Sequence, residues 1–251
     1  MSTIMMWHAI QGGKHIGLDE KTTYYRKEYA NCIDYIIAAS DNKEMWSQCT
    51  AVSNDKILSL GMPRTDRYIG KIKGDGKTIL ANKRSYLYVP TFRAHGEPAL
   101  PFIDWKWLDE HLSDDELFVI KSHPQGQSFL GKTNYKHIIE ADRMEPSVNY
   151  LYDCDVVITD YSSIIFDGYL LNKPSILFEK KTGYPEYRGM YMKYPWEYSS
   201  KYAANEQELL DLLRSTYALT EVEINCLNKV ANMCDGHSCK RICNLISNLN
   251  N

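Results

Sequence analysis

The chain has 251 residues, of which 44% are hydrophobic and 24% charged, and its formal net charge at pH 7 is -3. This length allows one large or two modest domains, and the composition is that of an ordinary soluble globular protein. The small net charge provides no broad basic surface, so we expect no nucleic-acid partner. The sequence shows neither a signal peptide nor an apolar run of the roughly 18–20 residues that span a bilayer. We therefore expect a cytoplasmic protein.

The seven cysteines are scattered without a regular framework, which predicts free thiols in a reducing compartment. Cys234, His237, Cys239 and Cys243 do lie close together. Their spacing matches none of the usual zinc patterns, and most of them fall in a predicted amphipathic helix, where cysteine packs as a small hydrophobic residue. We expect no metal site and no cofactor.

The N-terminal part of the sequence predicts short elements. An apolar run at residues 35–39 predicts a buried strand, and the polar residues 40–44 open a helix. Residues 57–66 predict a strand that enters a turn, and the Gly- and Lys-rich residues 71–77 predict a linker.

Strands and helices then alternate, which is typical of βαβ units in a parallel sheet. The alternating segments are residues 86–91, 101–112, 116–121, 135–139, 148–154, 155–159, 162–171 and 174–178. The last third is helical: Asn205 with Glu208 predicts a helix start, and further helices are expected at residues 221–233 and 238–249.

Polar side chains follow three of these predicted strands. They are Thr91 with Arg93, Lys121 with His123, and Ser162 with Ser163. The carboxyl ends of parallel strands lie on one edge of the sheet, where open α/β folds bind their ligands. Arg, Lys and protonated His bind phosphate. A strand-to-helix turn that carries hydroxyl groups can bind phosphate as well. The three strand ends therefore predict a diphosphate site.

Each group also has a purely structural interpretation. Ser162 or Asp160 could cap the following helix, and His123 alone is more often a loop histidine satisfied by its neighbours. We favour a binding site because three strand ends carry suitable groups together.

A set of motifs now points to a family. In chain order they are Trp7-His8-Ala9, Gly61–Asp66, Pro90–Arg93, Lys121–Pro124, Thr159–Ser163, Phe166-Asp167, and Asp235-Gly236 with Arg241. This ordered set resembles the CDP-glycerol glycerophosphotransferase family, the teichoic-acid primases and polymerases, over most of the chain. The resemblance implies a GT-B architecture, with two Rossmann-like domains facing across a cleft. It also implies transfer of glycerol phosphate or ribitol phosphate from a CDP-alditol to a hydroxyl acceptor, with CMP as the leaving group.

The resemblance also implies residue roles. His8 takes the place of the proposed general base, and His123 that of the second catalytic histidine, which contacts the donor phosphates. Thr91, Ser162 and Ser163 match residues around the donor phosphates. We add Arg93 and Lys121 because of their charge. The remaining predicted substrate-binding residues are Arg64, Asp66, Asp160 and Asp167.

Two departures from the family pattern stand out. The family has Gly where this chain has Ala9, which matters if that position needs a positive φ. Only six residues precede Trp7, so we expect an abbreviated N-terminal domain. Residues 1–70 would form the remainder of that domain, on the acceptor side, and residues 78–251 the C-terminal donor-nucleotide domain.

The expected acceptor is a polyol phosphate, glycan or glycolipid in teichoic-acid or surface-polysaccharide synthesis, which allows peripheral association with the inner membrane. Two alternatives remain open. A diphosphate site does not identify the transferred group, so the protein could be a GT-B glycosyltransferase that uses another nucleotide-sugar. It could also be a non-catalytic nucleotide-binding remnant of such an enzyme.

Overall fold

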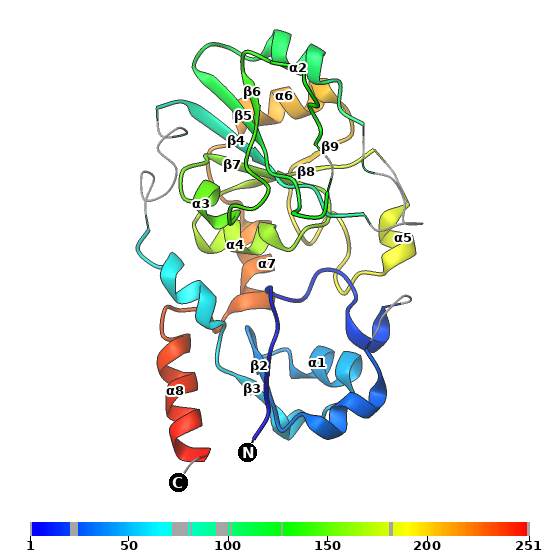
Figure 1. Cartoon of the computed structure of the whole chain (residues 1–251), viewed down its shortest axis with the longest axis vertical. Coiled ribbons are helices and arrows are strands. Elements are labelled where there is room, and N and C mark those ends of the chain that lie inside the picture. Colours follow the sequence, from blue (N-terminus) through cyan, green and yellow to red (C-terminus); the bar gives the residue numbers. More distant parts are fainter. Residues whose placement is uncertain are drawn as a thin grey trace.

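The computed structural model describes residues 2–20, 25–71, 80, 82–93, 100, 102–126, 128–180 and 183–249. All but the first residue of the predicted linker at 71–77 lies outside these ranges. Within the described part, the chain forms two parallel sheets in separate lobes, a small one below and a larger one above (Figure 1).

The small sheet has the strand order β1-β2-β3, with all strands parallel. Its strands are β1 (Ile4–Met6), β2 (Tyr35–Ala38) and β3 (Ile57–Ser59), and its helices are α1 (Lys43–Thr50), η1 (Gly17–Asp19), η2 (Lys27–Cys32) and η3 (Asn54–Lys56). Helix α1 begins after Asn42, whose side chain accepts a hydrogen bond from the Met45 N–H (3.3 Å). Ile36, Trp46 and Ile57 form the centre of the core between this helix and the sheet.

The large sheet has the order β6-β5-β4-β7-β8-β9, again with all strands parallel. Its strands are β4 (Arg84–Tyr88), β5 (Glu116–Ile120), β6 (Ile138–Glu140), β7 (Val156–Thr159), β8 (Ser175–Phe178) and β9 (Tyr202–Ala203). The chain adds strands to one side of β4 first and then, from β7 onward, to the other. The order therefore reverses between β4 and β7, which is where doubly wound sheets place their ligands. The predicted α/β fold with a Rossmann-like parallel sheet is confirmed.

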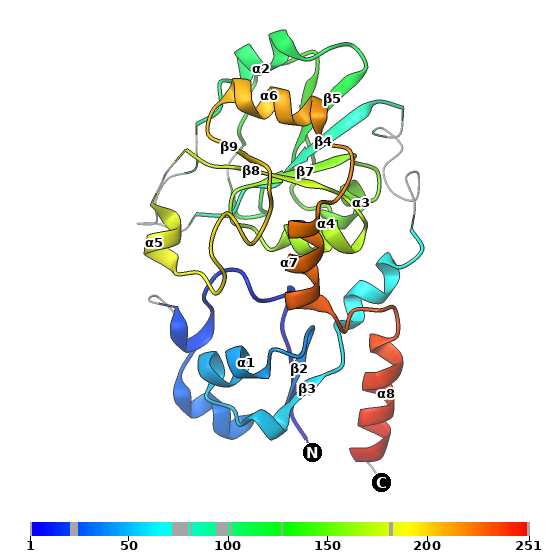
Figure 2. The ribbon, with the colours of Figure 1, turned by 180° about the vertical axis from the view of Figure 1, so that it is seen from behind.

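Helices cover both faces of the large sheet (Figure 2). One face carries α2 (Trp105–His111) and α6 (Glu206–Ser215), and the other carries α3 (Val148–Leu151), α4 (Ile164–Leu170) and α7 (Glu221–Ala231). The capping of α6 by Asn205 is confirmed, since its side chain accepts from the Glu208 N–H (2.9 Å). The predicted helix at residues 221–233 ends two residues early, at Ala231. Both faces of the central sheet are covered, since every residue of β7 and β8 is buried.

The C-terminal part of the chain returns to the small lobe (Figure 1). Helix α8 (Ser238–Leu249), which matches the predicted range, packs against η4 (Pro63–Tyr68). The Met233 N–H donates to the carbonyl of Ala39 at the end of the small sheet (3.1 Å). These contacts join the two ends of the chain in one lobe.

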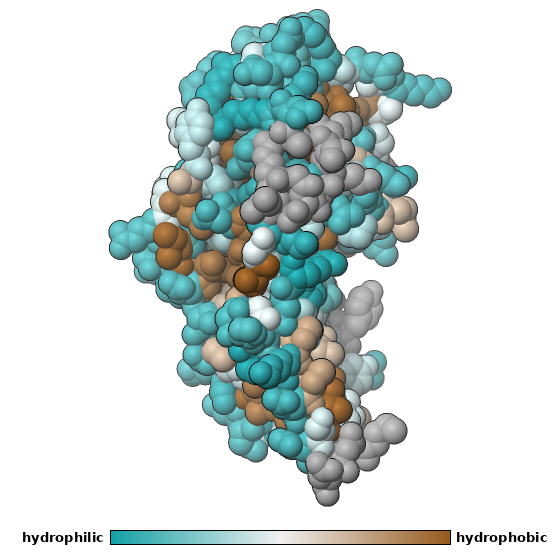
Figure 3. Space-filling view, turned by 90° about the vertical axis from the view of Figure 1, so that its left-hand side faces the viewer, coloured by the Kyte–Doolittle hydropathy of each residue, from teal (hydrophilic) through white to brown (hydrophobic). Residues whose placement is uncertain are grey.

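The surface on the side of α8 is mostly hydrophilic, with apolar residues gathered in patches at the waist and on the lower part (Figure 3). Among the described residues, no helix combines the length and apolar character needed to cross a membrane.

Candidate active site

The carboxyl ends of β4, β5 and β7 open into a cavity of about 500 Å³ between the two lobes. Most of the predicted site residues line it: His8, Arg64, Thr91, Lys121, His123, Ser162, Ser163 and Asp167. Asp66, Arg93 and Asp160 lie outside this lining. The structure thus brings the three polar strand ends together and places His8 with them.

Hydroxyl groups at two strand ends are available to a ligand. Thr91 is buried, and its hydroxyl has no hydrogen-bond partner among the described residues. Ser163 precedes α4, yet its hydroxyl makes no capping hydrogen bond. The Ser162 hydroxyl accepts a long hydrogen bond (3.4 Å) from the Ile164 N–H, so it only partly fills the capping role. Hydroxyl groups can donate to phosphate oxygens, so these three fit a phosphate group.

Arg93 and Asp160 form an ion pair (2.6 Å) with little exposure to solvent. Asp160 also accepts hydrogen bonds from the N–H groups of Thr91 (2.8 Å) and Tyr161 (2.6 Å). The Arg93 guanidinium lies over the Tyr184 ring, 4.0 Å from its centroid. The pair therefore ties the end of β4 to the end of β7 and holds Thr91 in place, while neither Arg93 nor Asp160 itself belongs to the lining of the 500 Å³ cavity.

His123 presents one ring nitrogen to the cavity. Its Nδ1 accepts a hydrogen bond from the Gln125 N–H (3.2 Å), and its ring packs against Phe92 at a centroid distance of 4.8 Å. Partial burial and the charges of Lys121 and Lys14 lower the pKa of His123. With Nδ1 accepting, the neutral ring carries its proton on Nε2 and can still donate to a phosphate oxygen.

Lys121 follows β5 but its ammonium group is engaged elsewhere. The side chain is buried, and Nζ donates to the carbonyl oxygens of Ser122 (3.1 Å) and Arg143 (2.9 Å). Burial lowers the pKa of this ammonium group. Lys121 thus organises the loop that carries His123, and it contributes charge to the cavity wall rather than a free donor.

His8 lies just after β1, on the opposite wall from the strand ends. The His8 side chain is exposed to solvent on one side. Its pKa is lowered, first by partial burial of the imidazole and second by the charges of Arg64 and Lys14. The neutral form, which can accept a proton, therefore predominates at neutral pH. The next residue, Ala9, is not among the non-glycine residues with positive φ. Its backbone does not require glycine, which explains why this departure from the family pattern is tolerated.

Arg64 connects the two lobes at the edge of the cavity. Its guanidinium, on η4, pairs with Asp167 on α4 (2.9 Å) and donates to the Tyr68 hydroxyl (2.7 Å). Burial raises the pKa of Asp167, and the attraction of Arg64 opposes that rise. Asp167 thus fixes the orientation of a cation that lines the cavity.

Asp66 does not line the cavity, unlike Arg64 of the same motif. Its carboxylate accepts hydrogen bonds from the N–H groups of Ser238 (3.0 Å) and Cys239 (2.7 Å) at the start of α8. These contacts are those of a helix-capping residue, and they give Asp66 a structural function away from the cavity.

Two cavity-lining cations were missed by sequence reasoning: Lys14 and Arg188. Lys14 follows two glycines shortly after His8, a signal that could have drawn attention to it. Arg188, on α5 (Tyr184–Arg188), pairs with Glu20 from the other lobe. That ion pair depends on a contact between distant segments, so no local pattern could reveal it.

The segments around these two cations form a contact that we call the clasp, residues 13–20 with residues 184–191. The His15 N–H donates to the Gly189 carbonyl (3.0 Å), and the Tyr191 N–H donates to the Gly13 carbonyl (2.8 Å). The clasp holds Lys14 and Arg188 at the mouth between the lobes.

Among the described residues, no group of three or more His, Cys, Asp and Glu side chains is arranged to hold a metal ion. The lysine and arginine residues that line this cavity are Lys14, Arg64, Lys121 and Arg188, of which Arg64 and Arg188 pair with Asp167 and Glu20.

Comparisons with known proteins agree with this geometry. A family model described as CDP-Glycerol:Poly(glycerophosphate) glycerophosphotransferase matches residues 1–248. The chain is 26% identical over 268 residues to the teichoic acid glycerol-phosphate primase of Bacillus subtilis (strain 168), covering 98% of this chain and 68% of that protein. It is 27% identical over 203 residues to the teichoic acid poly(ribitol-phosphate) polymerase of Bacillus spizizenii, covering 70% of this chain and 31% of that protein.

A solved structure of the wall teichoic acid polymerase TagF, a variant soaked with CDPG, superposes with a TM-score of 0.77 at 21% sequence identity. The superposition covers 99% of this chain and 67% of that one. It confirms the predicted GT-B-type fold, and the match of the family model to nearly the whole chain confirms the resemblance seen in the motifs. The chain belongs to the CDP-glycerol:poly(glycerophosphate) glycerophosphotransferase family.

Proposed function

We propose that this protein transfers glycerol phosphate from CDP-glycerol to a hydroxyl group of a polyol-phosphate acceptor and releases CMP. A bond forms between the acceptor oxygen and the phosphorus of the glycerol phosphate group. The bond from that phosphorus to the bridging oxygen breaks, and its electron pair leaves with CMP. The acceptor proton passes to His8, which returns it to solvent.

The observation that carries this proposal is the placement of His8 opposite the polar strand ends, across one cavity. Thr91, His123 and the serines of the β7–α4 turn would hold the diphosphate through hydrogen bonds. Fixed donors of this kind stabilise the charge that develops during phosphoryl transfer without any rearrangement. We likewise propose that residues 1–70 form the acceptor side and that the large lobe within residues 78–251 forms the donor side, with α8 (Ser238–Leu249) packed on the acceptor side.

The electrostatics of the cavity support the same assignment. Lys14, Arg64 and Arg188 line it and would attract a diphosphate, with Arg64 and Arg188 sharing their charge with Asp167 and Glu20. The lowered pKa of His8 keeps the imidazole neutral at neutral pH, as a general base requires. Asp167 is the acidic residue in this lining, and Arg64 neutralises it.

A binding and turnover experiment with the His8→Ala variant tests the proposal. CDP should raise the unfolding temperature of the wild type more than UDP at the same concentration, because a ligand that binds the folded state stabilises it. His8→Ala should lower glycerol phosphate transfer by a factor of roughly 10²–10⁴ while leaving CDP affinity unchanged. Radiolabelled CDP-glycerol and a short glycerophosphate oligomer measure the transfer.

His111→Ala is the matched control, because His111 is an exposed histidine on α2, outside the cavity lining. It should match the wild type in both assays. Equal stabilisation by UDP would favour a glycosyltransferase that uses another nucleotide-sugar. CDP binding by the wild type without transfer to any acceptor would favour a non-catalytic remnant.

A further inference from the structure

A second, smaller cavity lies beside the first. It has a volume of about 220 Å³. Five residues line both cavities: His8, Lys14, Ser162, Ser163 and Arg188. These side chains therefore form the boundary between the two spaces. The remaining wall of the small cavity consists mainly of Trp7, Gln11, Gly13, Glu20, Phe166 and Tyr198.

We propose that this small cavity binds the hydroxyl-bearing terminal polyol phosphate unit of the acceptor. The inference rests on the proposed transfer reaction and adds the location of the second substrate. Pockets for drug-sized ligands usually measure roughly 300–1,000 Å³. The small cavity lies below that range, so its size suits one polyol phosphate unit better than a whole nucleotide.

Two buried polar atoms in its wall favour a polar ligand. The Trp7 indole N–H and the Tyr198 hydroxyl have no hydrogen-bond partner among the described residues. Tyr198 is only 2% exposed, and a buried polar group without a partner is costly. Burial also raises the pKa of Tyr198, so its phenol keeps the proton and can donate it to a ligand oxygen.

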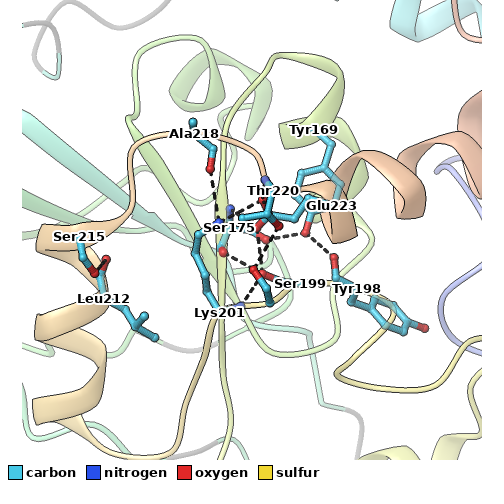
Figure 4. Close-up of polar contacts among 11 residues, drawn as sticks. Tyr169, Ser175, Tyr198, Ser199, Lys201, Leu212, Ser215, Ala218, Thr220 and Glu223 are labelled. Carbon is cyan, nitrogen blue, oxygen red and sulfur yellow. Dashed lines mark hydrogen bonds and ion pairs between the residues drawn. The ribbon is translucent and has the colours of Figure 1, made fainter.

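The backbone of Tyr198 is held in place independently of its hydroxyl. Its carbonyl oxygen accepts a hydrogen bond from the Tyr169 hydroxyl (2.8 Å), as part of a buried polar network. The phenol ring of Tyr198 extends away from that network (Figure 4). The hydroxyl therefore serves no visible structural purpose, whereas a ligand in the cavity would satisfy it.

The other lining groups match the chemistry of a polyol phosphate. Lys14 provides positive charge for the phosphate, and Arg188 presents the guanidinium that is paired with Glu20. The Glu20 carboxylate and the Gln11 amide oxygen can accept hydrogen bonds from hydroxyl groups. His8 lies on the boundary, so it can take the proton of a hydroxyl in the small cavity while the donor phosphorus lies in the large one.

Binding of sn-glycerol 3-phosphate to the CDP-saturated protein, followed by NMR chemical shifts, tests this placement. We expect it to bind alongside CDP. Tyr198→Phe removes only the hydroxyl and should weaken this binding about two- to tenfold, the value of one hydrogen bond. Gly13→Ala should weaken it roughly tenfold by filling space. The added methyl would lie 3.5 Å from the rings of Phe166 and Tyr198, an ordinary contact that the fold accommodates.

Both variants should keep the wild-type affinity for CDP. Gly13→Ala should keep the wild-type unfolding temperature, and Tyr198→Phe should keep or raise it, because it removes a buried hydroxyl without a partner among the described residues. In turnover both variants should raise the acceptor KM more than they change kcat. Tyr217→Phe, at an exposed tyrosine outside both cavities, is the control and should change nothing. Displacement of CDP by glycerol 3-phosphate, or unchanged affinity in both variants, would overturn the inference. Absence of CDP binding would overturn the proposed function, and the inference with it.

Discussion

The two cavity histidines share one electrostatic influence. Lys14 contributes to lowering the pKa of both His8 and His123, alongside partial burial. Burial is the largest cause for both imidazoles, followed by Arg64 for His8 and by Lys121 for His123, and Lys14 is the charge that the two share. Neutrality suits each one: His8 needs a free lone pair to accept a proton, and His123 donates from Nε2 without being charged.

The pH dependence of transfer follows from the sign of these shifts. The active, neutral form of His8 is lost only as the pH falls through a pKa below 6.5, so transfer should persist below that pH. Lys14→Met should raise the pKa of both histidines toward 6.5 and move the acid limb of the rate profile to higher pH. NMR titration of the imidazole resonances measures both values. The exposed Lys106→Met variant on α2 is the control, and unchanged histidine titrations in Lys14→Met would refute this account.

Thr91 offers a test of phosphate binding by one hydroxyl. Thr91→Val keeps the shape of the side chain and removes a hydroxyl that has no partner among the described residues. CDP affinity should fall about two- to tenfold, with little change in stability. Calorimetric titration and urea unfolding measure the two effects.

Thr159→Val on the neighbouring strand should behave in the opposite way. The Thr159 hydroxyl donates to the Val89 carbonyl (2.6 Å) and accepts a long hydrogen bond from the Ser162 N–H (3.4 Å), so its loss should reduce stability more than it reduces CDP affinity. If Thr91→Val instead lowered stability and left CDP binding unchanged, the hydroxyl would be a structural group.

At the level of elements, a buried polar network fastens α7 to the edge of the large sheet (Figure 4). Glu223, in the first turn of α7, is fully buried and pairs with Lys201 (2.9 Å), just before β9. It also accepts hydrogen bonds from the Ser199 hydroxyl (2.9 Å) and the Thr220 N–H (2.7 Å). The capping box of α7 and the sheet edge therefore depend on one carboxylate.

Glu223→Ala should lower the free energy of unfolding by about 3–5 kcal/mol, because it leaves the largely buried Lys201 ammonium group and the Ser199 hydroxyl without this carboxylate. Urea unfolding measures this change. Glu221→Ala is the matched control, since Glu221 is an exposed glutamate in the same helical turn, and it should stay within about 0.5 kcal/mol of the wild type. Equal, small losses in both variants would show that the network adds little.

At the level of the whole molecule, the clasp joins the lobes at the mouth of the cavity. Gly189 lies at its centre with a φ of 80°. A Cβ there would lie 2.1 Å from the His15 ring, which no side chain could tolerate without movement. The close approach of the two segments therefore requires glycine, both for its backbone conformation and for its size.

Gly189→Ala should open the clasp and destabilise the protein more than the strain of a positive φ alone. Gly183→Ala is the matched control. Gly183 has a similar φ of 75°, and a Cβ there would lie more than 4 Å from every described atom. In this control the free energy of unfolding should fall only by the backbone strain, about 1–2 kcal/mol. Hydrogen exchange at the His15 and Tyr191 amides should accelerate in Gly189→Ala alone. Equal exchange in both variants would contradict the role assigned to the clasp.

The sequence by itself determined the class of fold and the edge of the sheet on which the site lies. Apolar runs and helical periodicity are local properties, so the alternation of strands and helices after Ser85 could be recognised directly. Parallel strands place their carboxyl ends together, so Thr91, His123, Ser162 and Ser163 were bound to converge once the sheet was predicted. The ordered motifs added His8, which no periodicity would have connected to this edge.

Only the tertiary structure decided what each charged side chain contacts. Arg93 meets Asp160, 67 residues away, and lies outside the lining of the 500 Å³ cavity, although it lines an adjoining cavity with Thr91 and His123. Lys121 turns to backbone carbonyls, and Asp66 caps a helix 172 residues further along the chain. Arg188 enters the cavity through its pairing with Glu20 across the clasp. Long-range packing decides which partner a long charged side chain meets. The nearest opposite charge or carbonyl in space can come from a distant segment, so the neighbouring residues in the sequence do not identify it.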